Sequence, residues 1–398
     1  MAGMGVLAGA AAPERAARRI DRLGALACTV GVLAALFMPL LVFKSNRIAS
    51  GDPHSLLTAL PPVTATLLAL LLLGIGAVVL LSHNTLVRLA AGATGLIALA
   101  LAVGHGASWL VPAGDKYARV ALGGAFWLLA LALALLVTDA LARLRLGPTA
   151  RIVALLVAAL LVGALFWSGN WNDLSVMREY ATRAGVFWRE AQRHVLLSVG
   201  SLAAATLVGL PLGILCHRQP NLRAPVLQTL NLVQTIPSIA LFGILMAPLG
   251  YLATHVPLAA ALGIRGIGVA PAVVALFLYA LLPVVANTVI GLGQVSPAVV
   301  DAARGMGLTD RQLLTQIELP LAFPVILTGI RIVLVQSIGL VTVAALIGGG
   351  GFGTFVFQGI GQTAMDLVLL GAVPTVTLAF TAAVLLDAAV DLSRRGAA

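Results

Sequence analysis

Few residues of this chain are of a type that performs acid–base, nucleophilic or metal chemistry, and none is spaced for it. Cys28 and Cys216 lie in different apolar runs, and the six histidines show no ligand spacing. A phosphate-binding Walker A loop needs Gly-Lys-Ser/Thr, but neither lysine, Lys44 or Lys116, follows a glycine. The sequence therefore predicts no catalytic residue, no metal site and no cofactor, and it predicts that this chain does not bind ATP.

The polar residues that stand out are amides, hydroxyls and one arginine set within apolar runs of the second half. Such groups need partners in hydrocarbon, so each must face protein or water. For Arg331 the structural alternative is a bond to carbonyls that a nearby proline frees. The cluster predicts a solute path, although helix–helix hydrogen bonding explains each residue singly. The candidate lining residues are Gln234, Thr235, Pro237, Ser238, Asn287, Arg331 and Gln336.

The composition excludes a water-soluble globule, because 60% of the 398 residues are hydrophobic and only 10% are charged. The net charge of +10 does not indicate nucleic acid as a partner, since the basic residues are scattered between apolar runs. About ten runs reach the length of a membrane-spanning helix, which predicts an all-α polytopic protein in a lipid bilayer. The expected spans are residues 23–43, 63–81, 86–103, 120–137, 152–167, 195–216, 227–245, 269–292, 321–347 and 367–386.

The distribution of Lys and Arg favours a cytoplasmic location for both termini. Arg15, Arg18, Arg19 and Arg22 precede the first expected span. That span resembles the start of a signal peptide, but it is too long and lacks a small-residue cleavage site. We therefore expect it to remain as a membrane anchor.

The composition changes near Trp171, where Leu/Ala runs give way to spans that contain proline and amides. We expect an N-terminal membrane extension at residues 1–170, an extracytoplasmic amphipathic linker helix at 171–191 and a core of five spans at 192–392. The face of the linker that carries Tyr180 is expected to lie on the outer membrane surface, with docking of an external partner as the alternative.

Residues 294–320 form the longest polar interruption of the second half and are expected to make two short helices on the cytoplasmic side. Ser296 is the predicted cap of the first, and Gly307 can take the left-handed turn that ends it. Thr309 and Gln312 stand at capping-box spacing for the second. A compact knob of this kind suits a groove on a soluble partner.

The same loop resembles the EAA signature of permease subunits of bacterial ATP-binding-cassette (ABC) importers. That signature is Glu-Ala-Ala, three residues, Gly, nine residues, Ile, one residue and Leu-Pro, and the one departure here is Asp for Glu. The resemblance implies a type I permease core whose loop seats on ATPase subunits and transmits their closure and opening. The matching positions are Asp301, Ala302, Ala303, Gly307, Ile317, Leu319 and Pro320.

Three further stretches resemble the osmoprotectant branch of that family, which imports glycine betaine and related quaternary ammonium compounds. They are QTIPSIALFG from Gln234, YALLP from Tyr279 and IGGGGFG from Ile347. The resemblance implies the bacterial inner membrane as location and three kinds of partner: cytoplasmic ABC ATPase subunits, an extracytoplasmic solute-binding protein and a second permease copy or paralogue. Because only 5% of residues are aromatic, a cage for a quaternary ammonium group is expected outside this chain.

The glycine run that ends the ninth expected span satisfies G-x-G-x-x-G by chance, because no βαβ unit surrounds it. We expect a pliable, closely packed turn at the outer mouth, with an ordinary glycine-rich connection as the equal alternative. The candidate outer gate comprises Gly348, Gly349, Gly350, Gly351 and Gly353.

Three other functions stay open at this point. An ion- or proton-coupled secondary carrier would place carboxylates in mid-span, whereas Asp139, Asp366 and Asp387 fall near the ends of expected spans. An ABC permease for another small polar solute, such as an amino acid, would differ only in cargo. A membrane scaffold without transport would leave the path-lining amides dispensable.

Overall fold

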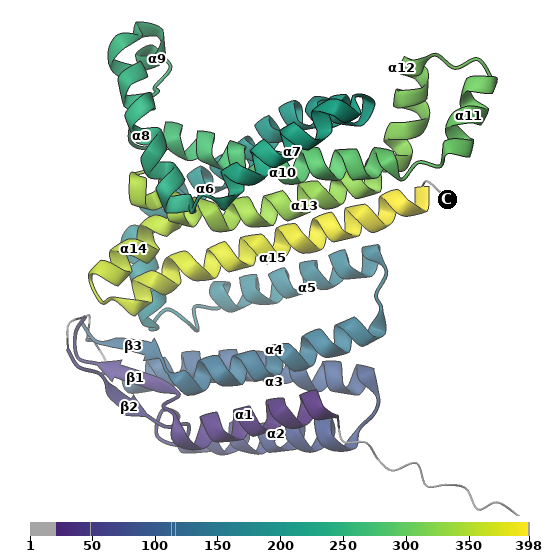
Figure 1. Ribbon diagram of the computed structural model, residues 1–398. Helices are drawn as coiled ribbons and strands as arrows, with labels where there is room; N and C mark the ends of the chain where they lie inside the picture. The colour runs from purple at the N-terminus through teal and green to yellow at the C-terminus, as the bar shows by residue number, and fades with distance from the viewer. Residues whose placement is uncertain (1–20, 48, 113, 116, 397–398) are drawn as a thin grey trace, which may run out of the picture. The chain divides into compact units, whose positions relative to one another are not determined.

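The structure is a computed structural model that describes residues 21–396 apart from residues 48, 113 and 116. Within that part of the chain, nine helices are long and apolar enough to cross a membrane, which confirms the expected all-α polytopic fold. Arg15, Arg18 and Arg19, used above to orient the first span, lie outside the described residues. The chain divides into two compact units, and each is described by itself (Figure 1).

The first unit is a bundle of apolar helices drawn from the described residues up to Leu41, from Pro53–Gly106 and from Leu122–Leu144. Glycine lets these helices approach closely, since a Cβ at Gly95 would lie 2.7 Å from the side chain of Leu133. The bundle is therefore held by dense aliphatic packing. Its helices are α1 (Arg22–Phe37), α2 (Pro62–Leu81), α3 (Thr85–Leu110), which extends beyond the unit, and α4 (Gly124–Leu144).

A cluster of charged side chains closes the end of this bundle at which α1 begins. Arg88 on α3 is 5% exposed and pairs with Asp21, which also accepts a hydrogen bond from Arg143 at 3.3 Å. Arg143 Nε donates to Asp139 at 2.7 Å on the same helix. Burial alone raises the pKa of Asp21, but the hydrogen bond and charge of Arg88 outweigh burial and lower that pKa below its usual value. At neutral pH the buried arginine therefore faces a charged carboxylate.

Three short strands occur where the chain passes between the sequence ranges of the two units. They are β1 (Leu41–Lys44), β2 (Asp52–His54) and β3 (Arg119–Leu122), in the order β2-β1-β3. The expected spans 23–43 and 120–137 are therefore each too long at one end. Pro39 explains the first difference, because it forces Met38 into extended backbone (φ −115°, ψ 152°) and ends α1 at Phe37.

The second unit contains Val42–Asp52, Ala107–Ala121 and all described residues from Arg145 onward. Its centre is the mutual packing of α6, α10 and α13, around buried residues such as Leu276 and Val341. α15 covers α13, and α5, which the sequence groups with the N-terminal extension, packs against α15. The helices are α5 (Pro148–Trp167), α6 (Ser175–Arg218), α7 (Pro220–Thr235), α8 (Ser238–His255), α9 (Pro257–Ala261), α10 (Val269–Gly293), α11 (Pro297–Gly305), α12 (Asp310–Gln312), a π-helix (Leu313–Glu318), α13 (Leu319–Ala344), a 3-10 turn (Ala345–Ile347), α14 (Gly353–Gly361) and α15 (Met365–Gly396).

The expected span at residues 227–245 is wrong as a single helix, because the chain breaks between α7 and α8. Ile236 adopts extended backbone (φ −68°, ψ 124°), as a residue before proline does, and Pro237 precedes the first residue of α8. α8 and α9 then project from the rest of the second unit (Figure 1). The break leaves the carbonyl of Ile236 in need of a partner.

The aromatic face of the expected linker helix packs against other helices of the same unit, which the sequence does not predict. The linker helix is the first part of α6, which kinks at Arg183 (φ −129°, ψ 15°) and continues into the membrane-length segment. Tyr180 and Phe187 pack against Phe352 and Phe355 at the start of α14. The apolar face was correctly located, but other helices of the same unit cover it.

Candidate functional site

The projecting loop begins with α11, whose end has the predicted left-handed glycine. Gly307 has φ +85°, and two backbone bonds close the turn: Gly307 N–H to Arg304 O at 2.9 Å and Leu308 N–H to Ala303 O at 3.2 Å. This is the Schellman pattern of a helix C-terminus. Ser296 occupies the predicted N-cap position, but its side chain makes no capping hydrogen bond.

The second arm of the loop starts with the predicted capping box. Thr309 N–H donates to Gln312 Oε1 at 2.9 Å, and Gln312 N–H donates to Thr309 Oγ1 at 3.4 Å. The expected short second helix does not end, however, because α12 continues through a π-helical turn into α13. Pro320 lacks the N–H that an α-helical turn would use, and the wider turn before it keeps the helix continuous. The loop and the span behind it therefore form one element.

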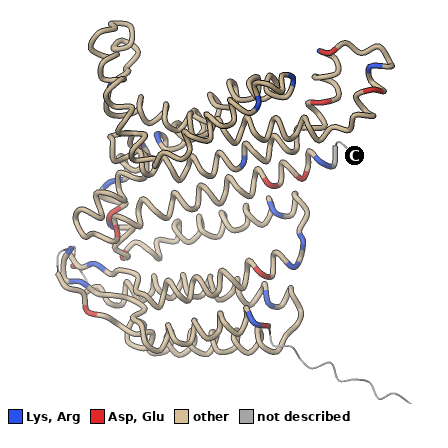
Figure 2. The backbone as a smooth tube through the Cα atoms, viewed as in Figure 1, with Lys and Arg blue, Asp and Glu red and all other residues tan. Residues whose placement is uncertain are grey.

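The loop is a knob with a small closed core and an exposed tip. Ala303 on α11 and Leu313 at the start of the π-helix are buried where the two arms of the loop pack together, with exposed fractions of 1% and 0%. Met306, at the turn between the arms, is 71% exposed. Asp301 and Ala302 are also exposed. Figure 1 shows α11 and α12 standing free of the other helices of the second unit, and Figure 2 shows acidic and basic residues interspersed along this loop. The knob thus offers its outer surface for contact with another molecule.

One buried ion pair joins the base of the knob to a neighbouring helix. Glu318, between Ile317 and Leu319, has a side chain that is 4% exposed, and it accepts a hydrogen bond from Arg218 Nη2 at 2.7 Å. Arg218 is the last residue of α6. A buried carboxylate needs such a partner, so the pair fixes the end of α6 against the start of α13.

Gln234 is engaged by the backbone of α10. Pro283 has no N–H, so the Tyr279 carbonyl one turn earlier lacks its helical partner, and Gln234 Nε2 donates to it at 2.7 Å. The Tyr279 hydroxyl in turn donates to the carbonyl of Ile236 at the break between α7 and α8. The two side chains therefore satisfy the carbonyls that two prolines leave free.

The other candidate path residues do not form one cluster with Gln234. Asn287 donates to Pro283 O at 2.8 Å and lies against Gly329, where a Cβ would be 2.7 Å from that of Asn287. Thr235 and Gln336 are exposed, on α7 and α13 respectively. Ser238 is half-buried at the start of α8, directly after Pro237.

Arg331 bonds to a carboxylate and not to carbonyls freed by a proline, so that part of the prediction is wrong. It pairs with Asp387 of α15, and the second oxygen of Asp387 accepts from Arg151 of α5 at 2.6 Å. Arg151 also reaches Asp391 at 3.0 Å. These four side chains, each between 33% and 40% exposed, link three helices and neutralise one another.

The glycine run forms a tight turn whose backbone is hydrogen-bonded to side chains of α6. Gly351 N–H donates to Glu190 Oε2 at 2.6 Å, and Phe352 N–H donates to His194 Nδ1 at 3.2 Å. His194 is 0% exposed. Because its Nδ1 accepts a hydrogen bond, we assign the ring proton to Nε2, which donates to Ile338 O at 3.0 Å.

Two different needs explain the glycines of this turn. Three of them have positive φ, and a Cβ at either of the other two would clash with a carbonyl of α13. The first group is Gly348, Gly350 and Gly351, and the second is Gly349 and Gly353.

The sequence does not indicate four residues that hold the loop, the glycine turn and Arg331 in place. Glu318, Glu190 and His194 have partners that are distant in the chain, and Asp387 falls near the end of an expected span. A signal nevertheless exists for both Glu318 and His194, because each is an ionisable residue just before an expected span. Such residues in membrane proteins need a partner and are candidates for a function.

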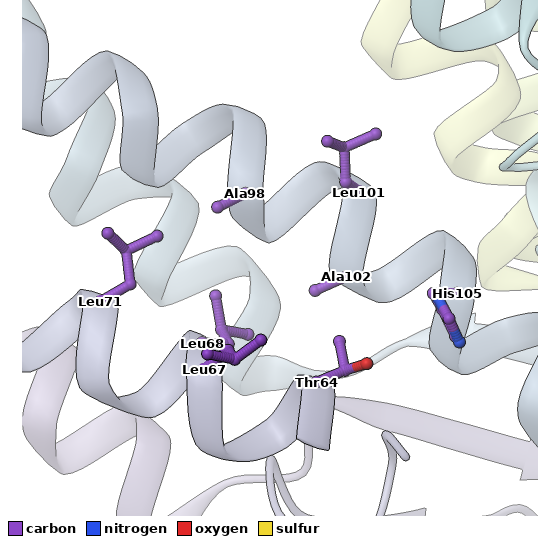
Figure 3. Close-up of a pocket in the computed structure, with 8 residues that line it drawn as sticks. All are labelled: Thr64, Leu67, Leu68, Leu71, Ala98, Leu101, Ala102 and His105. Atoms are coloured by element: carbon purple, nitrogen blue, oxygen red, sulfur yellow. The ribbon is translucent and has the colours of Figure 1, made fainter. Parts of the chain in front are cut away.

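The first unit has a pocket of about 220 Å³ between α2 and α3 (Figure 3). Its lining is mostly Leu and Ala, with Thr64 and His105 as the polar contributors. These walls suit an apolar group.

Family descriptions match both parts of the chain. Residues 205–397 match the binding-protein-dependent transport system inner membrane component, and residues 21–177 match the N-terminal domain of the ABC transporter permease YehY. Among solved structures, an inward-facing MetNI methionine ABC transporter is similar, with a TM-score of 0.46 and 21% identity over 52% of this chain and 95% of that chain.

Curated relatives each match about half of this chain. The osmoprotectant import permease protein OsmW of Salmonella typhimurium is 43% identical over 187 residues, which is 47% of this chain and 82% of OsmW. The carnitine transport permease protein OpuCD of Listeria monocytogenes is 36% identical, over 52% of this chain and 86% of that protein. The glycine betaine/carnitine/choline permease OpuCD of Bacillus subtilis is 35% identical, over 51% and 82%. With this identity, this coverage and a knob of matching spacing, the chain belongs to the family of inner-membrane permease subunits of binding-protein-dependent ABC transport systems.

Proposed function

We propose that this protein is the membrane-spanning subunit of an ATP-driven importer for osmoprotectants, with glycine betaine or a related quaternary ammonium compound as its solute. The observation that carries the proposal is an exposed loop with EAA spacing in a chain that is 43% identical to an osmoprotectant import permease over 187 residues. Relatives named for carnitine, choline and glycine betaine transport support the same class of solute.

Partner ATPase subunits bind the loop and transmit the energy of ATP hydrolysis through it. Asp301, Ala302 and Met306 form its exposed tip, and the continuous helix from Asp310 to Ile347 carries any displacement of that tip into the membrane. Binding and hydrolysis of ATP would then switch the path between outward and inward openings. Asp301, one methylene shorter than Glu, keeps the charge of the family residue with a shorter reach.

We assign the end of the second unit that carries the loop to the cytoplasm. The C-terminal end of α15 lies at the same end (Figure 1), and Arg218, Arg304, Arg311 and Arg394 gather there, as the positive-inside rule requires. The N-terminus is assigned to the cytoplasm as well. The opposite end, with the glycine turn, would receive solute from an extracytoplasmic binding protein.

The solute path would form against a second permease copy or paralogue. Gln234, Asn287 and Arg331 are occupied by bonds within this chain, so they position the helices that line the path. Thr235 and Gln336 remain exposed and are the polar groups we assign to the path itself. The glycines from Gly348 to Gly353 would close its outer mouth.

Reconstitution tests the proposal. The protein would be placed in liposomes with its ATPase and binding-protein partners, and uptake of labelled glycine betaine would be measured together with ATP hydrolysis. We expect ATP-dependent uptake and solute-stimulated hydrolysis, both reduced by Gly307→Asp in the loop. Uptake of an amino acid but not of betaine would instead identify another cargo, and flux without any ATPase would identify a secondary carrier.

A further inference from the structure

Two points along α6 are bonded to the segment of chain that continues from the loop through α13. At one of these points Arg218 pairs with the buried Glu318 at 2.7 Å, at the start of α13. The other point lies after the kink at Arg183, where Glu190 and His194 accept hydrogen bonds from Gly351 and Phe352, just after α13 ends. About 28 residues of helix separate these joints, which corresponds to roughly 42 Å at 1.5 Å per residue.

Around Gly209 and Gly213 the helix between the two joints packs closely against α10, and it keeps helical φ/ψ through Pro211. A Cβ at Gly213 would lie 2.5 Å from that of Thr288, and a Cβ at Gly209 would lie 2.8 Å from Val284. Thr288 is fully buried, and no residue of α6 after Arg183 leaves helical φ/ψ. Close-packed interiors transmit displacement instead of absorbing it.

We propose that α6 is the strut that carries movement of the loop to the glycine turn at the opposite end of the unit. Arg218 and Glu318 are positioning residues at the loop joint, and Glu190 is a positioning residue at the turn joint. The proposal rests on the proposed function, since the movement it transmits is that of an ATP-driven loop. The turn also follows Ile347 directly in the chain, so loss of either joint would leave ATP hydrolysis running while less of the loop movement reaches the turn.

The test measures solute moved per ATP hydrolysed, in liposomes that contain the complete transporter. Glu318→Gln is the main variant, because it removes the buried charge and leaves Arg218 at a partly exposed position. We expect hydrolysis to continue while the transport ratio falls about tenfold, the size of effect expected when one charge-assisted hydrogen bond is lost from the coupling between two sites. An unchanged ratio would overturn the proposal. Arg218→Gln breaks the same pair from the exposed side and replaces Glu318→Gln if that variant does not accumulate.

A double-mutant cycle separates a strut from two unrelated structural effects. Glu190→Gln should lower the ratio to a similar extent, and the double variant with Glu318→Gln should lose no more than about either single variant, because both break one link. If the losses of the two single variants instead multiply in the double variant, transmission through α6 is refuted. Arg223→Gln is the matched control, because Arg223 is an exposed arginine on α7 beside the same junction, and its ratio should stay unchanged.

The outcome also distinguishes this inference from the proposed function. If the unmodified transporter shows no ATP-driven uptake, the proposed function fails and the variants carry no weight. If the unmodified transporter takes up solute normally and the variants move as much solute per ATP hydrolysed, only the inference about α6 fails.

Discussion

At the residue scale, His194 shows how one side chain can hold a turn in place. Its Nδ1 is the acceptor for Phe352 N–H, and both residues are buried. We expect His194→Leu to lower the free energy of unfolding by about 1–3 kcal/mol, because the Phe352 N–H would lose its acceptor without gaining water. Unfolding in mixed micelles titrated with a denaturing detergent measures the change.

The matched control for that substitution is His83→Leu, at an exposed position in the first unit. It should alter stability by less than about 0.5 kcal/mol, as surface changes usually do. Equal effects of the two variants would show that the buried hydrogen bond does not hold the turn.

Asp387 and Asp391 offer a second comparison between neighbouring carboxylates. Asp387 serves both Arg331 and Arg151, whereas Asp391 reaches Arg151 alone at 3.0 Å. We expect Asp387→Asn to cost about 1 kcal/mol, a value reduced because all four side chains are at least 33% exposed, and Asp391→Asn to cost less. Thermal unfolding of the two purified variants in detergent ranks them, and a larger loss for Asp391→Asn would contradict the shared role of Asp387.

The sequence indicates which polar residues need a hydrogen-bond partner, but it does not indicate which group serves as that partner. Gln234 was recognised as an amide that hydrocarbon would not tolerate, yet its acceptor is a carbonyl of Tyr279 that Pro283 frees on another helix. Arg331 was likewise recognised as costly, and its partner is 56 residues further along the chain. Local pattern indicates a demand for a hydrogen bond, and only the packing of helices decides which group meets it.

At the element scale, Gly307 is where local conformation and function meet. Its φ of +85° favours glycine, and no heavy atom outside its neighbours lies within 4 Å of a Cβ built there. The cost of Gly307→Ala is therefore conformational and amounts to about 1–2 kcal/mol, which would shift the loop from its turn. We expect uptake in the reconstituted transporter to fall, with Gly307→Asn falling less, because asparagine tolerates the left-handed region.

Gly305→Ala is the control for this prediction. Gly305 also has open space around its Cβ position, but it lies in α11 and does not have positive φ. It should therefore keep normal uptake. A loss as large as that of Gly307→Ala would show that the loop surface, and not its turn, is sensitive to substitution.

Helix ends were predicted well where a left-handed glycine or a capping pair marks them. The turn at Gly307 and the box formed by Thr309 and Gln312 match the sequence-based prediction. The prediction failed where two signals compete, as at Pro237, which splits one apolar run into two helices, and at Pro320, which a π-helical turn accommodates without a break. Hydropathy gives the length of an apolar run but does not indicate where the helix in that run breaks.

At the scale of the whole molecule, the second unit is not continuous in sequence, which composition alone did not suggest. It takes in Val42–Asp52 and Ala107–Ala121 from the first half of the chain. Arg47 in the first of these segments pairs at 3.2 Å with Glu179, whose side chain is 8% exposed. Ala118 in the second accepts a hydrogen bond from Arg178 at 2.7 Å. The shift near Trp171 marks a change of helix type and not a boundary of packing.

This organisation predicts how a divided chain behaves. A fragment of residues 145–398 lacks both segments, so Glu179 keeps Arg183 as a partner but loses Arg47. We expect that fragment, expressed alone, to unfold in detergent at lower temperature than the same fragment co-expressed with residues 1–144, because a mostly buried carboxylate is then only partly compensated. Arg47→Gln in the undivided chain should reproduce part of the loss, whereas Arg22→Gln, in the first unit, should not. Equal stability of the fragment with and without residues 1–144 would mean that the two segments only border the second unit, and that its helices hold together without them.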